Sequence, residues 1–114
     1  MFNLGQSAEA RAEAFLKTHG LKLVARNWRC RFGEIDLVMQ DGPTLVFIEV
    51  RLRSRTDFGG AAASVTSSKQ RKLLAAARQY LGALATLPPC RFDVVAFTGE
   101  APPEWIKNAF DDMG

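Results

Sequence analysis

The chain has 114 residues, a length typical of one domain, and its 47% hydrophobic and 24% charged residues exclude a disordered or fibrous protein. No apolar run reaches the ~18 residues of a membrane span, and residues 1–20 lack the order of a signal peptide, so we expect a cytoplasmic protein. Cys30 and Cys90 form no CxxC pair, which argues against a disulfide framework or a thiolate zinc site and predicts reduced thiols.

The formal net charge of +3 is unevenly distributed. Residues 1–91 hold 14 Lys or Arg and 7 Asp or Glu, whereas residues 92–114 hold 1 and 5. Most of the cations lie in three short clusters: Arg26, Arg29 and Arg31; Arg51, Arg53 and Arg55; Lys69, Arg71 and Lys72. Such clusters are typical of a surface that binds a polyanion, and a solvated basic face is the alternative that charge alone leaves open.

Two helices are predicted from apolar spacing and end signals. The first covers about residues 7–19, with Ser7 as its N-cap. The second covers about residues 67–84 and begins with a capping box formed by Ser67 and Gln70.

Four strands are predicted around these helices. Residues 21–28, 34–40 and 44–51 form an antiparallel meander, and residues 91–98 form a strand that is apolar on both sides. Such a strand is buried, and a helical crossover places it parallel to the third strand. The predicted order is α-β-β-β-α-β in a single domain, residues 1–114, with residues 99–114 as a tail that packs back.

Two acids stand where strand residues should be apolar, namely Asp36 within Gly33–Val38 and Glu49 within Leu45–Arg51. A carboxylate is costly in such a position unless it is paired, hydrogen-bonded or bound to metal. If an even-length loop joins the two strands, opposed residue numbers sum to 85, and Asp36 stands across from Glu49. Two such carboxylates, with positions left for water and phosphate, suit Mg²⁺ or Mn²⁺.

Ordinary ion pairs are the alternative explanation for the same acids. The same register sets Glu34 across from Arg51. Asp36 and Glu49 would then cap nearby backbone groups or pair with Arg29 or Lys69.

Several short motifs, in their order and spacing, resemble a known family. They are Gly5, Glu9 and Ala12 in the first helix, Gly33-Glu34-Ile35-Asp36, Val46-Phe47-Ile48-Glu49-Val50-Arg51, Phe58-Gly59, Lys69 before a helix with Ala77 and Leu81, and Arg91-Phe92-Asp93-Val94-Val95. Over nearly its whole length the chain resembles the bacterial YraN-type family of uncharacterised proteins, which is similar to archaeal Holliday-junction resolvases. The resemblance implies the restriction-endonuclease-like α/β fold of the PD-(D/E)xK superfamily, a mixed sheet of about four strands flanked by two helices.

The resemblance also implies an activity and the residues that carry it. A metal-dependent endonuclease would act on DNA phosphodiesters, selectively on branched or damaged DNA, and as a homodimer because a junction has two strands to cut. Asp36 and Glu49 match the two metal-binding acids of the superfamily, with Mg²⁺ or Mn²⁺ as cofactor. Glu9 matches a further glutamate on the first helix, although an acid in the first turn of a helix is also stabilised by the helix dipole.

One position departs from the superfamily pattern, because Arg51 stands where a lysine is expected. Arginine stays protonated, so it would only orient water or stabilise phosphoryl charge. Lys69 on the following helix is the candidate substitute.

Further cations and aromatic residues are candidates for binding nucleic acid. Arg53 and Arg55 lead into a long segment, residues 52–66, in which Gly59 and Gly60 would allow closure over a phosphate backbone, and a mobile surface loop is the alternative. Trp28 and Phe58 would stack on unpaired bases or pack in the core. The remaining candidate contacts are Arg29, Arg31, Arg71 and Lys72.

Two other functions are also compatible with the sequence. The first is a nucleic-acid-binding adaptor that keeps the fold and the basic face but has lost the chemistry, and Arg51 motivates it. The second is a protein-interaction domain that uses its acidic tail, which contains Glu100, Glu104, Asp111 and Asp112.

Overall fold

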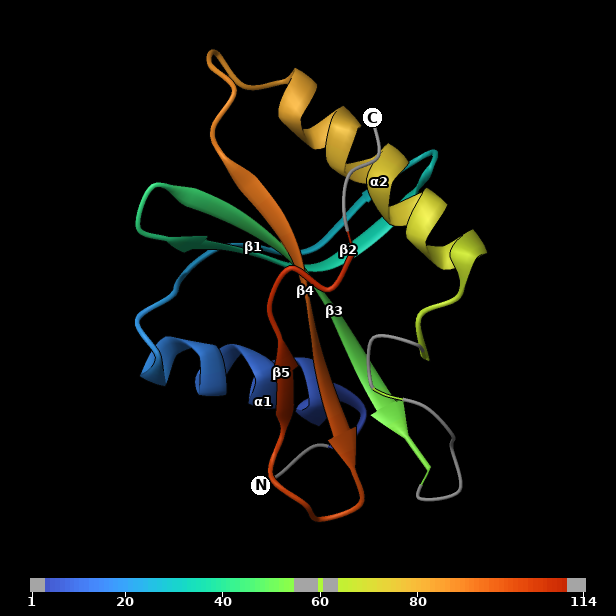
Figure 1. Cartoon of the computed structure of the whole chain (residues 1–114). Coiled ribbons are helices and arrows are strands. Elements are labelled where there is room, and N and C mark those ends of the chain that lie inside the picture. The colour runs from blue at the N-terminus through green and yellow to red at the C-terminus, as the bar shows by residue number, and fades with distance from the viewer. Residues whose placement is uncertain (1–3, 55–59, 61–63, 111–114) are drawn as a thin grey trace.

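The computed structural model describes residues 4–54, 60 and 64–110 and shows a five-stranded sheet with one helix on each face (Figure 1). The order α-β-β-β-α-β is confirmed, and a short fifth strand follows it. Neither described helix has the length and apolar character needed to cross a membrane. The elements are α1 (Leu4–Thr18), β1 (Lys22–Cys30), β2 (Gly33–Asp41), β3 (Thr44–Arg53), α2 (Ser67–Gly82), β4 (Cys90–Thr98) and β5 (Glu104–Ile106).

The sheet is mixed and its strands follow chain order, β1-β2-β3-β4-β5. Only β3 and β4 are parallel, and α2 forms the crossover between them, as predicted. The β2–β3 hairpin pairs Asp41 with Thr44 and continues to Leu37 with Ile48, so the predicted register is confirmed over this ladder. Because this register follows from the loop length and the apolar alternation, it was readable from the sequence.

Two hydrophobic cores fill the two faces of the sheet. On the α2 side, Leu73, Ala76 and Ala77 pack against strand residues that include Ile35 and Phe47. On the α1 side, Ala12 and Leu16 pack against a second set that includes Leu37 and Ile48. The central strands are therefore buried on both faces, which explains their nearly continuous apolar runs.

The C-terminal segment packs back on the sheet, as predicted, and adds one strand to the expected four. Trp105 of β5 pairs with Val95 of β4 in an antiparallel ladder. Beyond this strand, the ring of Phe110 stacks on that of Phe92 with 5.3 Å between centroids.

Both predicted N-caps are wrong, although helix α2 begins at Ser67 as predicted. Helix α1 begins at Leu4, so Ser7 lies inside it, where serine costs only a fraction of a kcal/mol. Helix α2 is capped by Thr66, whose hydroxyl accepts a hydrogen bond from the amide of Lys69 (3.2 Å). Gln70 donates to the Val65 carbonyl (3.0 Å), so Ser67 and Gln70 form no capping box. Adjacent Thr66, Ser67 and Ser68 offered several caps, and the loop path decided among them.

Candidate active site

Asp36 and Glu49 lie side by side where β2 and β3 separate. The two strands pair as far as Leu37 and Ile48, and Asp36 and Glu49 occupy the next position of the same register. Their side chains are buried, with 8% and 4% of the residue exposed, and are close enough to share a hydrogen bond. The structure thus brings together the two acids that the sequence singled out.

The side chains of β2 change face at the point where the strands part. Leu37 faces the α1 core, whereas Ile35, two residues earlier, faces the α2 core. On β1 the matching residue between Arg26 and Trp28 is Asn27, whose φ of 48° is left-handed. Asparagine tolerates this conformation better than most residues. The carboxylate of Asp36 then accepts the amide of Val50 (2.9 Å) and links the parting strands.

Glu49 is less well satisfied than Asp36. Its Oε1 is buried and has no hydrogen-bond partner among the described residues. The nearest cations are Lys69 Nζ at 3.8 Å and Arg51 Nη1 at 3.9 Å from its Oε2, beyond hydrogen-bond length. Ion pairing of the expected kind with Lys69 is therefore present but weak, and it leaves one carboxylate oxygen open.

The electrostatics of the pair favour holding a proton or a cation. Burial, and then the charge of Asp36, raises the pKa of Glu49 from 4.5 to about 7, although Lys69 and Arg51 oppose this. Burial also raises the pKa of Asp36, while the amide of Val50 lowers it. Near neutral pH the second negative charge is disfavoured, and a bound cation would relieve the repulsion.

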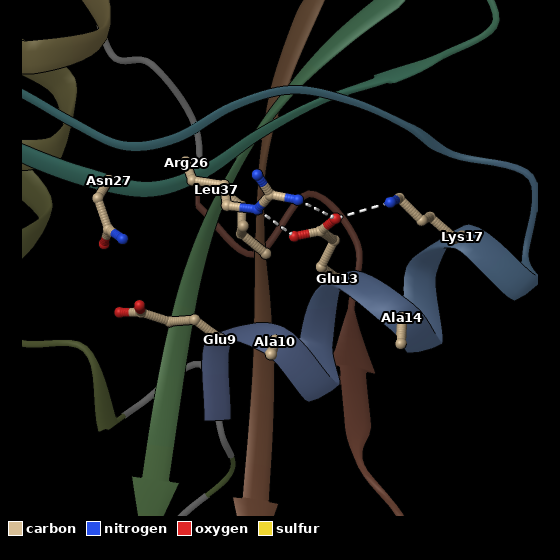
Figure 2. Close-up of a pocket in the computed structure, with 8 residues that line it drawn as sticks. All are labelled: Glu9, Ala10, Glu13, Ala14, Lys17, Arg26, Asn27 and Leu37. Atoms are coloured by element: carbon tan, nitrogen blue, oxygen red, sulfur yellow. Dashed lines mark hydrogen bonds and ion pairs between the residues drawn. The ribbon is translucent and has the colours of Figure 1, made fainter. Parts of the chain in front are cut away.

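Glu9 of α1 lies near Asp36, one of the two acids. Burial raises the pKa of Glu9, the charge of Asp36 raises it further, and the Asn27 side chain lowers it. Figure 2 shows Glu9 and Asn27 pointing toward each other at one end of a cleft of about 520 Å³ between α1 and β1. In the same cleft the guanidinium of Arg26 donates two hydrogen bonds to Glu13, at 2.7 and 2.9 Å. Glu9 is therefore the acid of α1 that is directed toward the site.

A two-carboxylate site fits a hard divalent cation. Within the described residues, no three His, Cys, Asp or Glu side chains are grouped as a ready ligand set. Mg²⁺ nevertheless commonly uses one or two protein carboxylates and completes its shell with water and phosphate oxygens. The open Oε1 of Glu49 beside Asp36 is a donor of the required chemistry.

The structure rejects one expected ion pair. Glu34 pairs with Arg29 of β1 at 3.0 Å, not with Arg51, because the β1–β2 register sets Arg29 directly opposite Glu34. Arg51 is left beside Glu49, and its Nε is buried with no hydrogen-bond partner among the described residues.

Two other candidate binding residues are placed differently from the expectation. Arg53 is the last residue of β3, and its side chain is only 10% exposed. Its Nη1 lies 3.9 Å from an oxygen of Glu104, so this acid of the C-terminal segment pairs with Arg53. Trp28 packs edge-on against Tyr80 at 5.3 Å in the α2-side core, so the packing alternative is confirmed for it. Arg55, Phe58 and Gly59 lie outside the described residues, as do Asp111 and Asp112.

The other candidate cations are exposed and gather near one turn. Arg29 and Arg31 flank the β1–β2 turn, and Arg71 and Lys72 lie on the exposed side of α2. Gly33 brings the turn and the helix together, since a Cβ at this glycine would lie 3.4 Å from the Cβ of Lys72. Two of the three cation clusters are therefore neighbours in space.

Comparison with known proteins identifies the family. The family model described as the uncharacterised protein family UPF0102 matches residues 8–97, which include Glu9, Asp36, Glu49 and Lys69. The chain belongs to the UPF0102 family. It is 60% identical to a UPF0102 protein of Nitrosospira multiformis, with 94% of this chain and 92% of that protein covered. It is 61% identical to one of Cupriavidus pinatubonensis (94% and 84% covered) and 56% identical to one of Aeromonas hydrophila (93% and 83% covered).

Two residues near the site were missed by sequence reasoning. Asn27 interrupts a strand pattern with a residue of low β-propensity, which is the signal for a local distortion. Phe32 lies in a turn between Arg31 and Gly33, and an aromatic residue at such a position is a signal for exposure. Asn27 belongs to β1 and Phe32 to the turn after it, whereas the two buried acids of the site belong to β2 and β3.

Proposed function

We propose that this UPF0102 protein is a cytoplasmic, Mg²⁺- or Mn²⁺-dependent endonuclease that cleaves DNA phosphodiesters, selectively in branched or damaged DNA. The observation that carries the proposal is the buried Asp36–Glu49 pair, in which Glu49 Oε1 has no hydrogen-bond partner among the described residues. Buried carboxylates are normally paired, hydrogen-bonded or bound to metal. A site with two acids, one open oxygen and adjacent cations is suited to a metal and a phosphate.

Asp36 and Glu49 would hold the metal, which when bound lowers the pKa of its water and offsets charge on the phosphate. Asp36 is held in place by the amide of Val50. Glu9 approaches from α1 and would orient a water or accept its proton, which its raised pKa favours.

Lys69 and Arg51 would bind the scissile phosphate. Both are within 4 Å of Glu49, and both are about one-third exposed, so a phosphate can reach them. Thr66 fixes the first turn of α2, because its hydroxyl binds the amide of Lys69. Arginine at position 51 supplies a fixed positive charge, which leaves Lys69 as the cation able to exchange a proton.

The test is cleavage of labelled four-way junction, duplex and single-stranded DNA by the purified protein with Mg²⁺, Mn²⁺ or EDTA. Asp36→Asn and Glu49→Gln remove the charges without changing the side-chain shape. Asp41→Asn is the matched control, because it neutralises an acid at the far end of the same strand. We expect metal-dependent cleavage that both site variants reduce at least about 100-fold and the control retains. Cleavage that survives in both site variants would overturn the proposal.

The adaptor remains the second candidate, because Arg51 occupies the position of the expected lysine. In this case the protein binds DNA without cutting it, and binding is unchanged in Asp36→Asn and Glu49→Gln.

The proposed nuclease resolves junctions as a homodimer. Sedimentation of the complex with a four-way junction tests this, and we expect two protein chains per junction.

A further inference from the structure

The turn between β1 and β2 exposes an aromatic ring among cations. Phe32 is 44% exposed, and it is the aromatic residue among the exposed large apolar side chains of the described residues. The guanidinium of Arg31 lies over its ring, 5.1 Å from the centroid. The turn therefore presents an apolar ring and the positive charge of Arg31 side by side.

Contacts on both sides hold this turn in place. Gly33 follows the ring with φ 154°, and an added Cβ there would meet the Cβ of Lys72 at 3.4 Å and its carbonyl oxygen at 3.5 Å. Arg29 and Glu34 close the hairpin by an ion pair at 3.0 Å. Figure 1 shows the β1–β2 turn next to α2. A ring on a fixed turn loses little conformational entropy when a partner packs on it.

The charges around the ring select the partner. Arg29, Arg31, Arg71 and Lys72 are all exposed, and the nearby acid Glu34 is already paired with Arg29. Cations of this density attract a polyanion, and an exposed aromatic ring gives that polyanion a stacking surface. Single-stranded nucleic acids combine a charged backbone with bases that stack on aromatic side chains, so they match both features.

The distance to the acid pair is short. Phe32 precedes Asp36 by four residues, which span at most about 13 Å at the rise of a β-strand. This length corresponds to a few nucleotides of one strand. A strand with its phosphate at Asp36 and Glu49 would therefore have a nearby base within reach of Phe32.

We propose that Phe32 stacks on an unpaired DNA base a few nucleotides from the phosphate bound at Asp36 and Glu49, and so selects DNA with unpaired bases beside a duplex. This inference rests on the proposed function for the position of the phosphate. It goes beyond that function by naming the residue that distinguishes forked from fully paired DNA. An acidic protein segment would pair with the cations, but it does not combine its charges with a regular series of flat rings as nucleic acid does, so we favour DNA.

The experiment measures binding with Ca²⁺ in place of Mg²⁺, because Ca²⁺ also binds carboxylate and phosphate oxygens and so keeps the phosphate at Asp36 and Glu49. A denaturing gel checks that no strand is cut. Fluorescence anisotropy gives Kd for a labelled forked DNA and for a fully paired duplex of the same length. The variants are Phe32→Ala, Phe32→Trp and the matched control Leu87→Ala. Leu87 is also an exposed apolar residue, 75% exposed, but it follows the C-terminal end of α2. Circular dichroism checks that each variant is folded.

We expect Phe32→Ala to weaken forked-DNA binding about 5- to 150-fold, the range for loss of one stacked base, and to change duplex binding less. Phe32→Trp should restore the preference, because tryptophan also stacks, and Leu87→Ala should leave it unchanged. The inference is overturned if Phe32→Ala weakens both DNAs equally, if neither DNA binds, or if Phe32→Trp is as weak as Phe32→Ala.

The binding assay separates this inference from the proposed chemistry. A fork preference that depends on Phe32 in a protein that never cleaves would support the stacking residue and remove the nuclease. Cleavage that depends on Asp36 and Glu49, with no role for Phe32 in binding, would keep the nuclease and remove the stacking residue.

Discussion

Two sets of buried acids in the same sheet have opposite surroundings. Asp93 of β4 has no exposed surface, and its carboxylate accepts hydrogen bonds from three donors. Arg91 Nε donates at 3.0 and 3.2 Å, Trp105 Nε1 at 2.9 Å and the amide of Asn108 at 2.9 Å. Two of these donors belong to the C-terminal segment, so Asp93 ties β5 and the residues after it to the sheet.

The Asp36–Glu49 pair lacks such saturation. Asp36 accepts a hydrogen bond from one backbone amide, and Glu49 Oε1 has no hydrogen-bond partner among the described residues. The two carboxylates are also close enough for their charges to repel each other. Burial without full compensation costs free energy. Asp93 therefore stabilises the fold, whereas the Asp36–Glu49 pair is tolerated at a cost and is the better candidate for binding a ligand. The comparison shows that the partners of a buried acid, rather than its burial, indicate its role.

The largest predicted effect is on the saturated acid. Asp93→Ala should lower the free energy of unfolding by about 3–5 kcal/mol, because it leaves the part-buried Nε of Arg91, the indole N–H of Trp105 and the amide of Asn108 without their acceptor. Urea denaturation measures this. Asp41→Asn is the control, since Asp41 also pairs with Arg91 (3.0 Å) but is partly exposed, and it should cost less than about 1 kcal/mol. Equal stability of the two variants would contradict a structural role for Asp93.

Glu49→Gln should raise the free energy of unfolding, in contrast to Asp93→Ala. The amide keeps the side-chain shape and removes a charge that burial disfavours, so we expect stability at pH 8 to rise by roughly 1–3 kcal/mol. The same urea experiment checks it. A loss of stability as large as that of Asp93→Ala would show that the Glu49 carboxylate is structural, and the contrast between the two regions would disappear.

The pH dependence of stability sharpens the same contrast. Because the pKa of Glu49 is raised from 4.5 to about 7 in the fold, the folded chain keeps a proton that the unfolded chain releases. Raising the pH from 4.5 through 7 should therefore lower stability through Glu49, and the loss from this group ends about one pH unit above 7. Urea midpoints of the native chain and Glu49→Gln, measured from pH 4 to 8, isolate this contribution as their difference. A difference that does not change with pH would refute the raised pKa.

The smallest predicted effect concerns Arg51. Arg51→Lys should increase Mg²⁺-dependent cleavage of the preferred DNA about tenfold, because lysine can take part in proton transfer and arginine cannot. Arg78→Lys, an exposed position of α2 outside the site, is the control and should leave the rate unchanged. If Arg51→Lys cleaves more slowly than the native chain, then two-point binding by arginine is part of the site.

The sequence by itself determined much of the fold and the position of the acid pair. Alternation along β2 and β3 and the even length of the loop, which is Gly42 and Pro43, set the hairpin register, and the register put Asp36 beside Glu49. The apolar run of β4 indicated a buried strand parallel to β3. These features follow from local periodicity, because a one-residue slip would turn every apolar side chain of a strand to the wrong face.

Only the tertiary structure decided which groups surround the acids. The amide and the indole that saturate Asp93, the approach of Glu9 to Asp36, and the contact of Gly33 with Lys72 all join different elements of the fold. No periodic pattern encodes such contacts, because they depend on how the helices pack on the twisted sheet. The sequence therefore located Asp36 and Glu49 as costly carboxylates, whereas packing decided that Glu49 would be left open and that Asp93 would be satisfied.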